Sequence, residues 1–165
     1  MNIHQNSLDI IKSFQLPAYS EIPDVGLYLK QVVKYINDIA GVTFGFTVTD
    51  SMLSNYVKMH IVPSPVKKQY YRDHIVLLLF ISMAKSVLTL ENIDSLMKHL
   101  EMNYETKDAY SSFKQEFEST LRTVYGLEET PSESAALSDD QILLKNIIIA
   151  MCYKFYLDDF FRTQK

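Results

Sequence analysis

The sequence has 165 residues, 47% of them hydrophobic and 22% charged, and carries a formal net charge of −4. This composition fits one soluble domain or slightly more, and the negative charge argues against nonspecific binding to polyanions. The chain contains only four glycines and five prolines, which leaves few tight turns and favours helices over a β-sandwich or barrel. Its one cysteine, Cys152, lies in an apolar run and has no partner for an internal disulfide.

The location of the protein is predicted from its apolar stretches. The longest, residues 76–84 and 147–153, are shorter than the roughly 20 residues that span a membrane. The first residues lack the basic and apolar regions of a signal peptide. We therefore expect a cytoplasmic protein without a membrane anchor.

The N-terminal part of the chain is predicted to be an arm, residues 1–23, followed by a helix. Two prolines in the arm favour extended backbone before them. Asp24 is the expected N-cap of the helix, whose apolar residues recur at helical spacing, and Gly41 is its expected end. Residues 41–48 are β-branched and aromatic, which predicts a short extended connector.

A second helix is predicted over residues 50–60, capped by Thr49 or Asp50. Its apolar residues fall on one side and its short polar residues towards the other. Pro63 and Pro65 disfavour helix at the residues before them, so the helix must stop near Ile61. Residues 61–63 and 69–71 are then expected to pair as a two-strand ribbon around 66–68.

The rest of the chain reads as helices. Residues 73–87 are apolar on nearly every face, which predicts a central helix. Thr89 opens the next helix, and a longer one follows from Thr106. After an acidic loop at 126–137, which includes Glu133, a capping box of Ser138 and Gln141 opens a helix that reaches about residue 161.

The densest positive charge lies in the segment 51–72. It carries four basic residues and no Asp or Glu, so the remainder of the chain carries a formal −8. Its polar residues suit contacts with DNA phosphates and with base edges. The candidate DNA-binding residues are Thr49, Ser51, Ser54, Asn55, Tyr56, Lys58, Lys67, Lys68, Tyr70 and Arg72. The alternative interpretation is a solvated surface turn without a ligand.

Catalytic chemistry has no comparable pattern. The four histidines, His4, His60, His74 and His99, show no metal-ligand spacing, and one cysteine offers no second thiolate. No phosphate-binding glycine motif is present. The sequence therefore predicts neither an enzyme nor a metal site nor a bound cofactor.

Two resemblances refine this interpretation. The segments SNYVKMHIVPSP, KKQYY and LTLENIDSLM resemble, in order, the recognition helix, the wing and a later helix of MerR-type DNA-binding domains. The usual arginines of that recognition helix are missing. The segments LPAYSEIPDVGLYLKQVVKYIN and SMLSNYVKMHIVPSPVKKQYYRDHI resemble a family of small proteins from Gram-positive bacteria, known as a domain of unknown function.

The MerR resemblance implies an all-α, MerR-like winged helix-turn-helix with a short two-strand wing, followed by a C-terminal helical region. The predicted parts are an arm (1–23), the winged helix domain (24–102) and a dimerisation or effector region (103–165). The expected function is regulation of transcription by binding duplex DNA, as a homodimer formed through the C-terminal helices.

Alternatives to this function remain open at this point. The winged-helix scaffold could serve as a protein-interaction module without DNA. The C-terminal helix 139–161 could be buried within one chain instead of forming a dimer. A third possibility is that the C-terminal helices enclose a small hydrophobic effector, although aromatic stripes at helical spacing usually form a core.

Overall fold

The computed structural model describes residues 3–132 and 135–165, and each regular element of secondary structure named in this part of the chain is a helix. Glu133 of the acidic loop and the side chain of His4 lie outside the described positions. The helices are α1 (Ile3–Ser13), α2 (Leu29–Ile36), α3 (Val42–Phe44), α4 (Asp50–Lys58), α5 (Arg72–Ala84), α6 (Leu90–Asn103), α7 (Thr106–Val124) and α8 (Asp139–Thr163). The predicted all-α class is confirmed.

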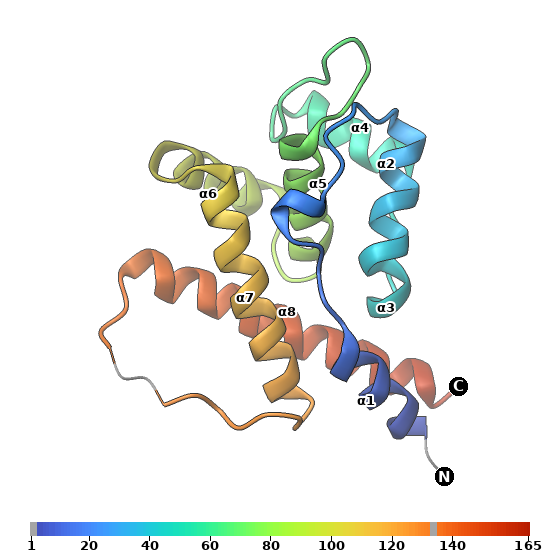
Figure 1. The fold of residues 1–165 in the computed structure, drawn as a ribbon, viewed down its shortest axis with the longest axis vertical. Coiled ribbons are helices and arrows are strands. Elements are labelled where there is room, and N and C mark those ends of the chain that lie inside the picture. The colour runs from blue at the N-terminus through green and yellow to red at the C-terminus, as the bar shows by residue number, and fades with distance from the viewer. Residues whose placement is uncertain (1–2, 133–134) are drawn as a thin grey trace. The chain divides into compact units, whose positions relative to one another are not determined.

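The chain packs as two compact units. One comprises Pro17–Ser111, and the other combines Met1–Leu16 with Ser112–Lys165 (Figure 1). The division between them therefore falls within α7. The predicted limits of the arm and of the domain, at residues 23 and 102, are not tested by this division and stay predictions. The first part of the predicted arm forms the helix α1.

Helix α5 forms the core of the Pro17–Ser111 unit. Its residues from Ile75 to Ala84 are buried with the exception of Leu77, as the apolar sequence predicts. A helix that is apolar on all faces is stable only when neighbours cover it. Helices α2 and α4 belong to the same unit and pack against each other.

The first helix of this unit departs from the sequence prediction at its start. Asp24 does not cap it, because the Asp24 carboxylate instead accepts a hydrogen bond of 3.0 Å from the backbone N–H of Arg72. Helix α2 begins at Leu29, after Tyr28, whose N–H donates to the Gln31 side chain at 2.8 Å. Arg72, the residue that binds Asp24, is 48 residues away in the sequence.

The end of that helix also differs from the prediction. The helix does not end at Gly41, because a π-helical turn, Asn37–Gly41, leads directly into α3. The helical segment ends at Gly45, whose φ is 75°. The residues 42–44, predicted to be extended, are therefore helical. Gly41 is required for packing instead, because a Cβ there would lie 2.6 Å from the carbonyl oxygen of Phe46.

The π-helical turn places Asn37 where it holds the connector to α4. The Asn37 side-chain oxygen accepts from the N–H of Val48 at 2.8 Å, and its amide donates to the carbonyl of the same residue at 3.1 Å. This pair of bonds fixes the backbone just before Thr49, which caps α4. Single-turn π-helical insertions of this kind have a local structural cost and commonly position a particular side chain.

Phe117 is at the centre of the second unit. The centroid of its ring lies 6.4 Å from that of Phe14, directly after α1, and 6.3 Å from that of Phe155 in α8, both in edge-to-face geometry. Cys152 is buried beside it, and burial raises the pKa of the Cys152 thiol. The aromatic stripes on α7 and α8 therefore form a packed core, and one face of α8 is buried within its own chain.

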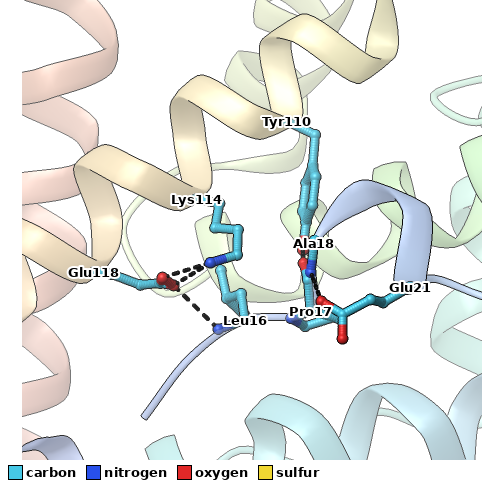
Figure 2. A network of polar contacts seen from close by, with 7 residues as sticks. All are labelled: Leu16, Pro17, Ala18, Glu21, Tyr110, Lys114 and Glu118. Carbon is cyan, nitrogen blue, oxygen red and sulfur yellow. Dashed lines mark hydrogen bonds and ion pairs between the residues drawn. The ribbon is translucent and has the colours of Figure 1, made fainter. Parts of the chain in front are cut away.

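A buried carboxylate also belongs to this unit. Glu118 accepts hydrogen bonds from the Lys114 ammonium at 2.7 and 2.9 Å and from the N–H of Leu16 at 3.3 Å (Figure 2). Glu118 is only 7% exposed, so these three bonds compensate for the loss of water around its charge. In the other unit, the Tyr110 hydroxyl donates to the carbonyl of Pro17 at 2.6 Å (Figure 2).

Candidate nucleic-acid interface

Helix α4 carries the first part of the candidate site. Thr49 caps it by accepting from the N–H of Met52 at 3.2 Å, which confirms the predicted start. Leu53 and Tyr56 are buried on one side of the helix. The predicted polar side is largely open to solvent: Thr49, Ser51, Asn55 and Lys58 are exposed, and Ser54 is half-buried.

The chain leaves α4 through a tight turn. His60 has a φ of 59°, in the left-handed region, and the N–H of Ile61 bonds back to the carbonyl of Tyr56 at 3.1 Å. Ile61 and Val62 are buried beyond this turn. The turn reverses the chain and anchors it in the core, so that the proline segment that follows starts from a fixed point.

A two-residue hairpin then presents two lysines. The N–H and carbonyl groups of Val66 and Gln69 exchange hydrogen bonds of 3.0 and 2.9 Å. Between them, Lys67 and Lys68 have φ values of 50° and 65°. Two consecutive left-handed residues are typical of a type I′ turn, which normally carries Asn and Gly. Lysines here are strained, at a cost of about 1 kcal/mol or more each.

The hairpin lies in the loop between α4 and α5, which projects at one end of its unit (Figure 1). Together, α4 and the hairpin carry three lysines and one acidic residue, Asp50. Lys58, Lys67 and Lys68 are exposed, and none of them forms an ion pair within residues 3–132 and 135–165. Their charges are therefore not neutralised by the acidic remainder of the described chain. We call α4 together with Val66–Gln69 the basic edge.

The predicted two-strand wing is wrong. Residues 61–63 do not pair with 69–71, and no strand forms in the described parts of the chain; the extended pairing there consists of isolated bridges. Pro63 and Pro65 lack N–H groups, so the segment before the hairpin cannot supply a ladder of hydrogen bonds. Tyr70 pairs instead with Leu27, through two backbone hydrogen bonds of 2.8 Å.

Arg72 has a different environment from the three lysines. Its guanidinium donates to the carbonyls of Ile22 at 2.9 Å and Ser20 at 3.2 Å, and it lies 5.2 Å from the ring centroid of Tyr19. Asp24 is 3.9 Å away. Arg72 therefore clamps the segment 19–24 onto the start of α5, and its charge is engaged inside the fold.

The two tyrosines among the candidate residues are core residues in the structure. Tyr56 is 1% exposed, with the Lys85 ammonium 5.8 Å from its ring centroid, and Tyr70 is 5% exposed. Their burial positions α4 and the hairpin. The candidates on the accessible side of the basic edge are therefore Ser51, Ser54, Asn55, Lys58, Lys67 and Lys68, and Thr49 is exposed at its start. The remaining three, Tyr56, Tyr70 and Arg72, hold the edge in place.

His74 also supports the hairpin, and sequence reasoning missed it. Its Nδ1 accepts from the N–H of Tyr71 at 3.0 Å, so Nε2 carries the proton and donates to the carbonyl of Ser64 at 3.1 Å. The ring therefore joins the proline segment to the start of α5. The only signal in the sequence was its position three residues after the N-cap Tyr71, where a side chain can return to the cap.

Two other kinds of site are absent from the described residues. No helix there is long and apolar enough to cross a membrane. No three His, Cys, Asp or Glu side chains are grouped where they could hold a metal ion in that part of the chain.

The fold and the site define an all-helical protein whose Pro17–Ser111 unit carries a short polar helix followed by a strained basic hairpin. Residues 17–119 match the family described as Domain of unknown function (DUF1836), and the chain belongs to that family. This confirms the resemblance to a family of unknown function. The matched region begins where the Pro17–Ser111 unit begins. Comparisons with curated proteins and with solved structures found no match.

Proposed function

We propose that this protein binds duplex DNA through the basic edge and regulates transcription as a dimer. The observation that carries the proposal is the pair of lysines held in left-handed conformations at an exposed hairpin tip. Strained residues persist where the surrounding structure over-determines them, and they cluster at functional sites. Asn and Gly fit this turn without strain, so the presence of two lysines is explained by their charge.

The chemistry of the basic edge suits a phosphate backbone with base edges nearby. Lys58, Lys67 and Lys68 supply ammonium groups that are free to release counterions from phosphates. Ser51 and Asn55 lie on the exposed side of α4, and Asn is suited to bidentate contact with adenine. The order of polar helix, proline turn and basic hairpin is also that of a MerR-like domain. These features support DNA binding in a cytoplasmic regulator.

The number of basic groups limits the affinity of one copy. Three lysines per protomer make few phosphate contacts, and α4 lacks arginine. Two copies bound to adjacent half-sites would double the contacts, which is why the proposal includes a dimer. A dimer of this kind also fits the pseudo-palindromic operators that two-fold symmetric proteins recognise.

A second function, docking to an acidic protein, is favoured by exposed apolar residues near the hairpin. Val66 is 55% exposed, and Val25 and Tyr28, which flank the paired residue Leu27, are 80% and 57% exposed. Large apolar side chains next to lysines are more typical of protein interfaces than of phosphate contacts. Retention of a stoichiometric protein partner after nuclease treatment would favour this function over DNA binding.

Charge reversal tests the proposed function. We expect the wild-type protein to select duplex fragments from a genomic pool at low salt, and Lys67→Glu/Lys68→Glu to lose this binding. The matched control is Lys12→Glu/Lys107→Glu, which changes the net charge equally at two exposed lysines outside the basic edge. Equal loss in both variants would show a nonspecific charge effect, and no selection by the wild type would reject the proposal.

A further inference from the structure

The residue directly after α4, Met59, places an accessible sulfur beside Asn55. The Asn55 side-chain amide donates to the Met59 Sδ at 3.3 Å, and the N–H of Met59 donates to the Asn55 carbonyl at 2.9 Å. A spacing of four residues brings two side chains next to each other on a helix surface. The two residues are therefore joined through backbone and side chain, and both are exposed.

Solvent reaches Met59 more easily than it reaches most methionines of the chain. Met59 is 44% exposed, and Met102, on α6, is 84% exposed. The other methionine side chains that the structure describes are half-buried or buried: Met52, Met83, Met97 and Met151. A dissolved oxidant must reach a sulfur to react with it, so we expect Met59 and Met102 to be oxidised before the others.

A peroxide converts the Met59 thioether to a sulfoxide by transferring one oxygen atom. The O–O bond of hydrogen peroxide breaks, an S–O bond forms, and the remaining oxygen leaves as water. The sulfur loses two electrons and the peroxide gains two. The product side chain is polar, and its oxygen is a stronger hydrogen-bond acceptor than the thioether sulfur.

This conversion changes what Asn55 can bind. A bidentate contact with adenine uses the Asn amide N–H as a donor to N7 and the amide oxygen as an acceptor from N6. A thioether is a weak acceptor, so the Asn55 amide can leave Met59 for a base. A sulfoxide oxygen beside it holds the amide more strongly. Lys67 and Lys68 keep their charges on the hairpin, so contacts with phosphates persist.

We propose that Met59 is a modification site, at which oxidation to the sulfoxide by a peroxide weakens base recognition by Asn55 and leaves phosphate binding intact. The consequence for DNA rests on the proposed function. The reaction at Met59 and its effect on the Asn55 amide do not, because both can be measured without DNA. Methionine sulfoxide reductases reduce the sulfoxide, so the modification is reversible.

The first test uses the full-length protein without DNA and dilute hydrogen peroxide as the oxidant. Mass spectrometry of peptides is expected to find the sulfoxide at Met59 and Met102 before the buried Met83. The side-chain amide signals of Asn55 in a nitrogen–proton correlation spectrum are expected to shift on oxidation, and Met59→Leu is expected to abolish this shift. A Met59 that stays reduced while Met102 reacts, or Asn55 signals that do not respond to Met59 oxidation, overturns the proposal.

The second test compares the duplex that the wild type selects with an unrelated duplex of the same length. Peroxide is expected to lower the ratio of the two affinities about tenfold, the value of one bidentate contact, and reductase treatment is expected to restore it. The affinity for the unrelated duplex is expected to stay within about twofold, because phosphate contacts carry no sequence information.

Two variants locate the effect. Met59→Leu removes the thioether and is expected to keep its affinity ratio after peroxide, whereas Met102→Leu is expected to lose it as the wild type does. An equal loss in both variants overturns the proposal. A wild type that binds no duplex before oxidation rejects the proposed function, and the peptide map and the Asn55 signals then still decide whether Met59 is the modification site.

Discussion

Tyr70 and Leu27 exchange two backbone hydrogen bonds of 2.8 Å, so the hairpin that carries Lys67 and Lys68 is attached to the segment before α2. A two-residue hairpin alone is marginally stable in water. This attachment, with the burial of Tyr70 and the His74 bridge, gives the lysines a fixed position. The basic edge is therefore supported by the buried Tyr70 and by the half-buried Leu27 and His74.

Relief of the hairpin strain should separate stability from binding. In the variant Lys67→Asn/Lys68→Gly the residues fit a type I′ turn, so we expect the free energy of unfolding to rise by about 1 kcal/mol. Duplex affinity should fall, because two ammonium groups are lost. Urea unfolding and fluorescence anisotropy measure the two quantities. A variant that is less stable, or that binds as tightly as the wild type, would contradict this explanation of the lysines.

The Arg72 clamp predicts a loss of stability even when the charge is kept. Arg72→Lys cannot donate to the carbonyls of Ile22 and Ser20 together, because an ammonium lacks the planar fork. We expect the free energy of unfolding to fall by about 1–2 kcal/mol. Lys58→Ala is the control, with an expected change within about 0.5 kcal/mol for an exposed residue without an ion pair. Equal stability of Arg72→Lys and the wild type would show that the clamp contributes nothing.

The Tyr19 hydroxyl predicts a transition at alkaline pH. It donates to Asp73 at 2.7 Å, and this hydrogen bond, with burial and the Asp73 charge, raises the pKa of Tyr19 from 10.0 to about 12. Because the folded pKa is above the ordinary value, the contribution to stability is complete below pH 10. It is lost as the pH rises through about 12.

Tyrosinate absorbance provides the measurement for this prediction. The difference between the titration curves of the wild type and Tyr19→Phe should contain one group that ionises near pH 12. A difference curve centred near 10 would indicate that the bond to Asp73 does not form in solution.

The ion pair of the buried Glu118 with the partly buried Lys114 predicts a non-additive pattern of substitutions. Lys114→Met leaves the Glu118 carboxylate buried with only the N–H of Leu16, and we expect it to lower the free energy of unfolding by about 3 kcal/mol. The double variant Lys114→Met/Glu118→Leu removes both charges and should recover part of that loss. Chemical unfolding of the two variants is the measurement. A double variant less stable than Lys114→Met would refute the role given to the pair.

Local sequence signals predicted the elements with clear caps and periodic apolar residues. Thr49, Thr89 and Ser138 each accept the hydrogen bond expected of an N-cap, and α4, α6 and α8 begin directly after them. The composition of residues 126–137 also predicted a loop, and the described residues of this segment form no helix. These features depend on residues within one helical turn of each other, which is the range that sequence patterns encode.

The errors have a common cause in contacts between distant segments. Asp24 was predicted to cap a helix because its hydrogen bond with Arg72 cannot be recognised from the sequence. The hairpin residue Tyr70 pairs with Leu27 and not with the neighbouring residues 61–63. Arg72 was likewise predicted to contact phosphate, because its true partners, two backbone carbonyls, are 50 and 52 residues away and cannot be recognised from the sequence. The accessible lysines were identified from charge alone, while the residues that position them required the structure.

The salt dependence of duplex binding tests the central claim most directly. If Lys67 and Lys68 each neutralise a phosphate, the slope of log K against log salt concentration should be shallower by about 2 per bound protomer in Lys67→Asn/Lys68→Gly, which binds more weakly, than in the wild type. The control Lys12→Glu/Lys107→Glu should keep the wild-type slope. Identical slopes in all three proteins, or no duplex binding by the wild type at any salt concentration, would contradict the assignment of the basic edge to DNA.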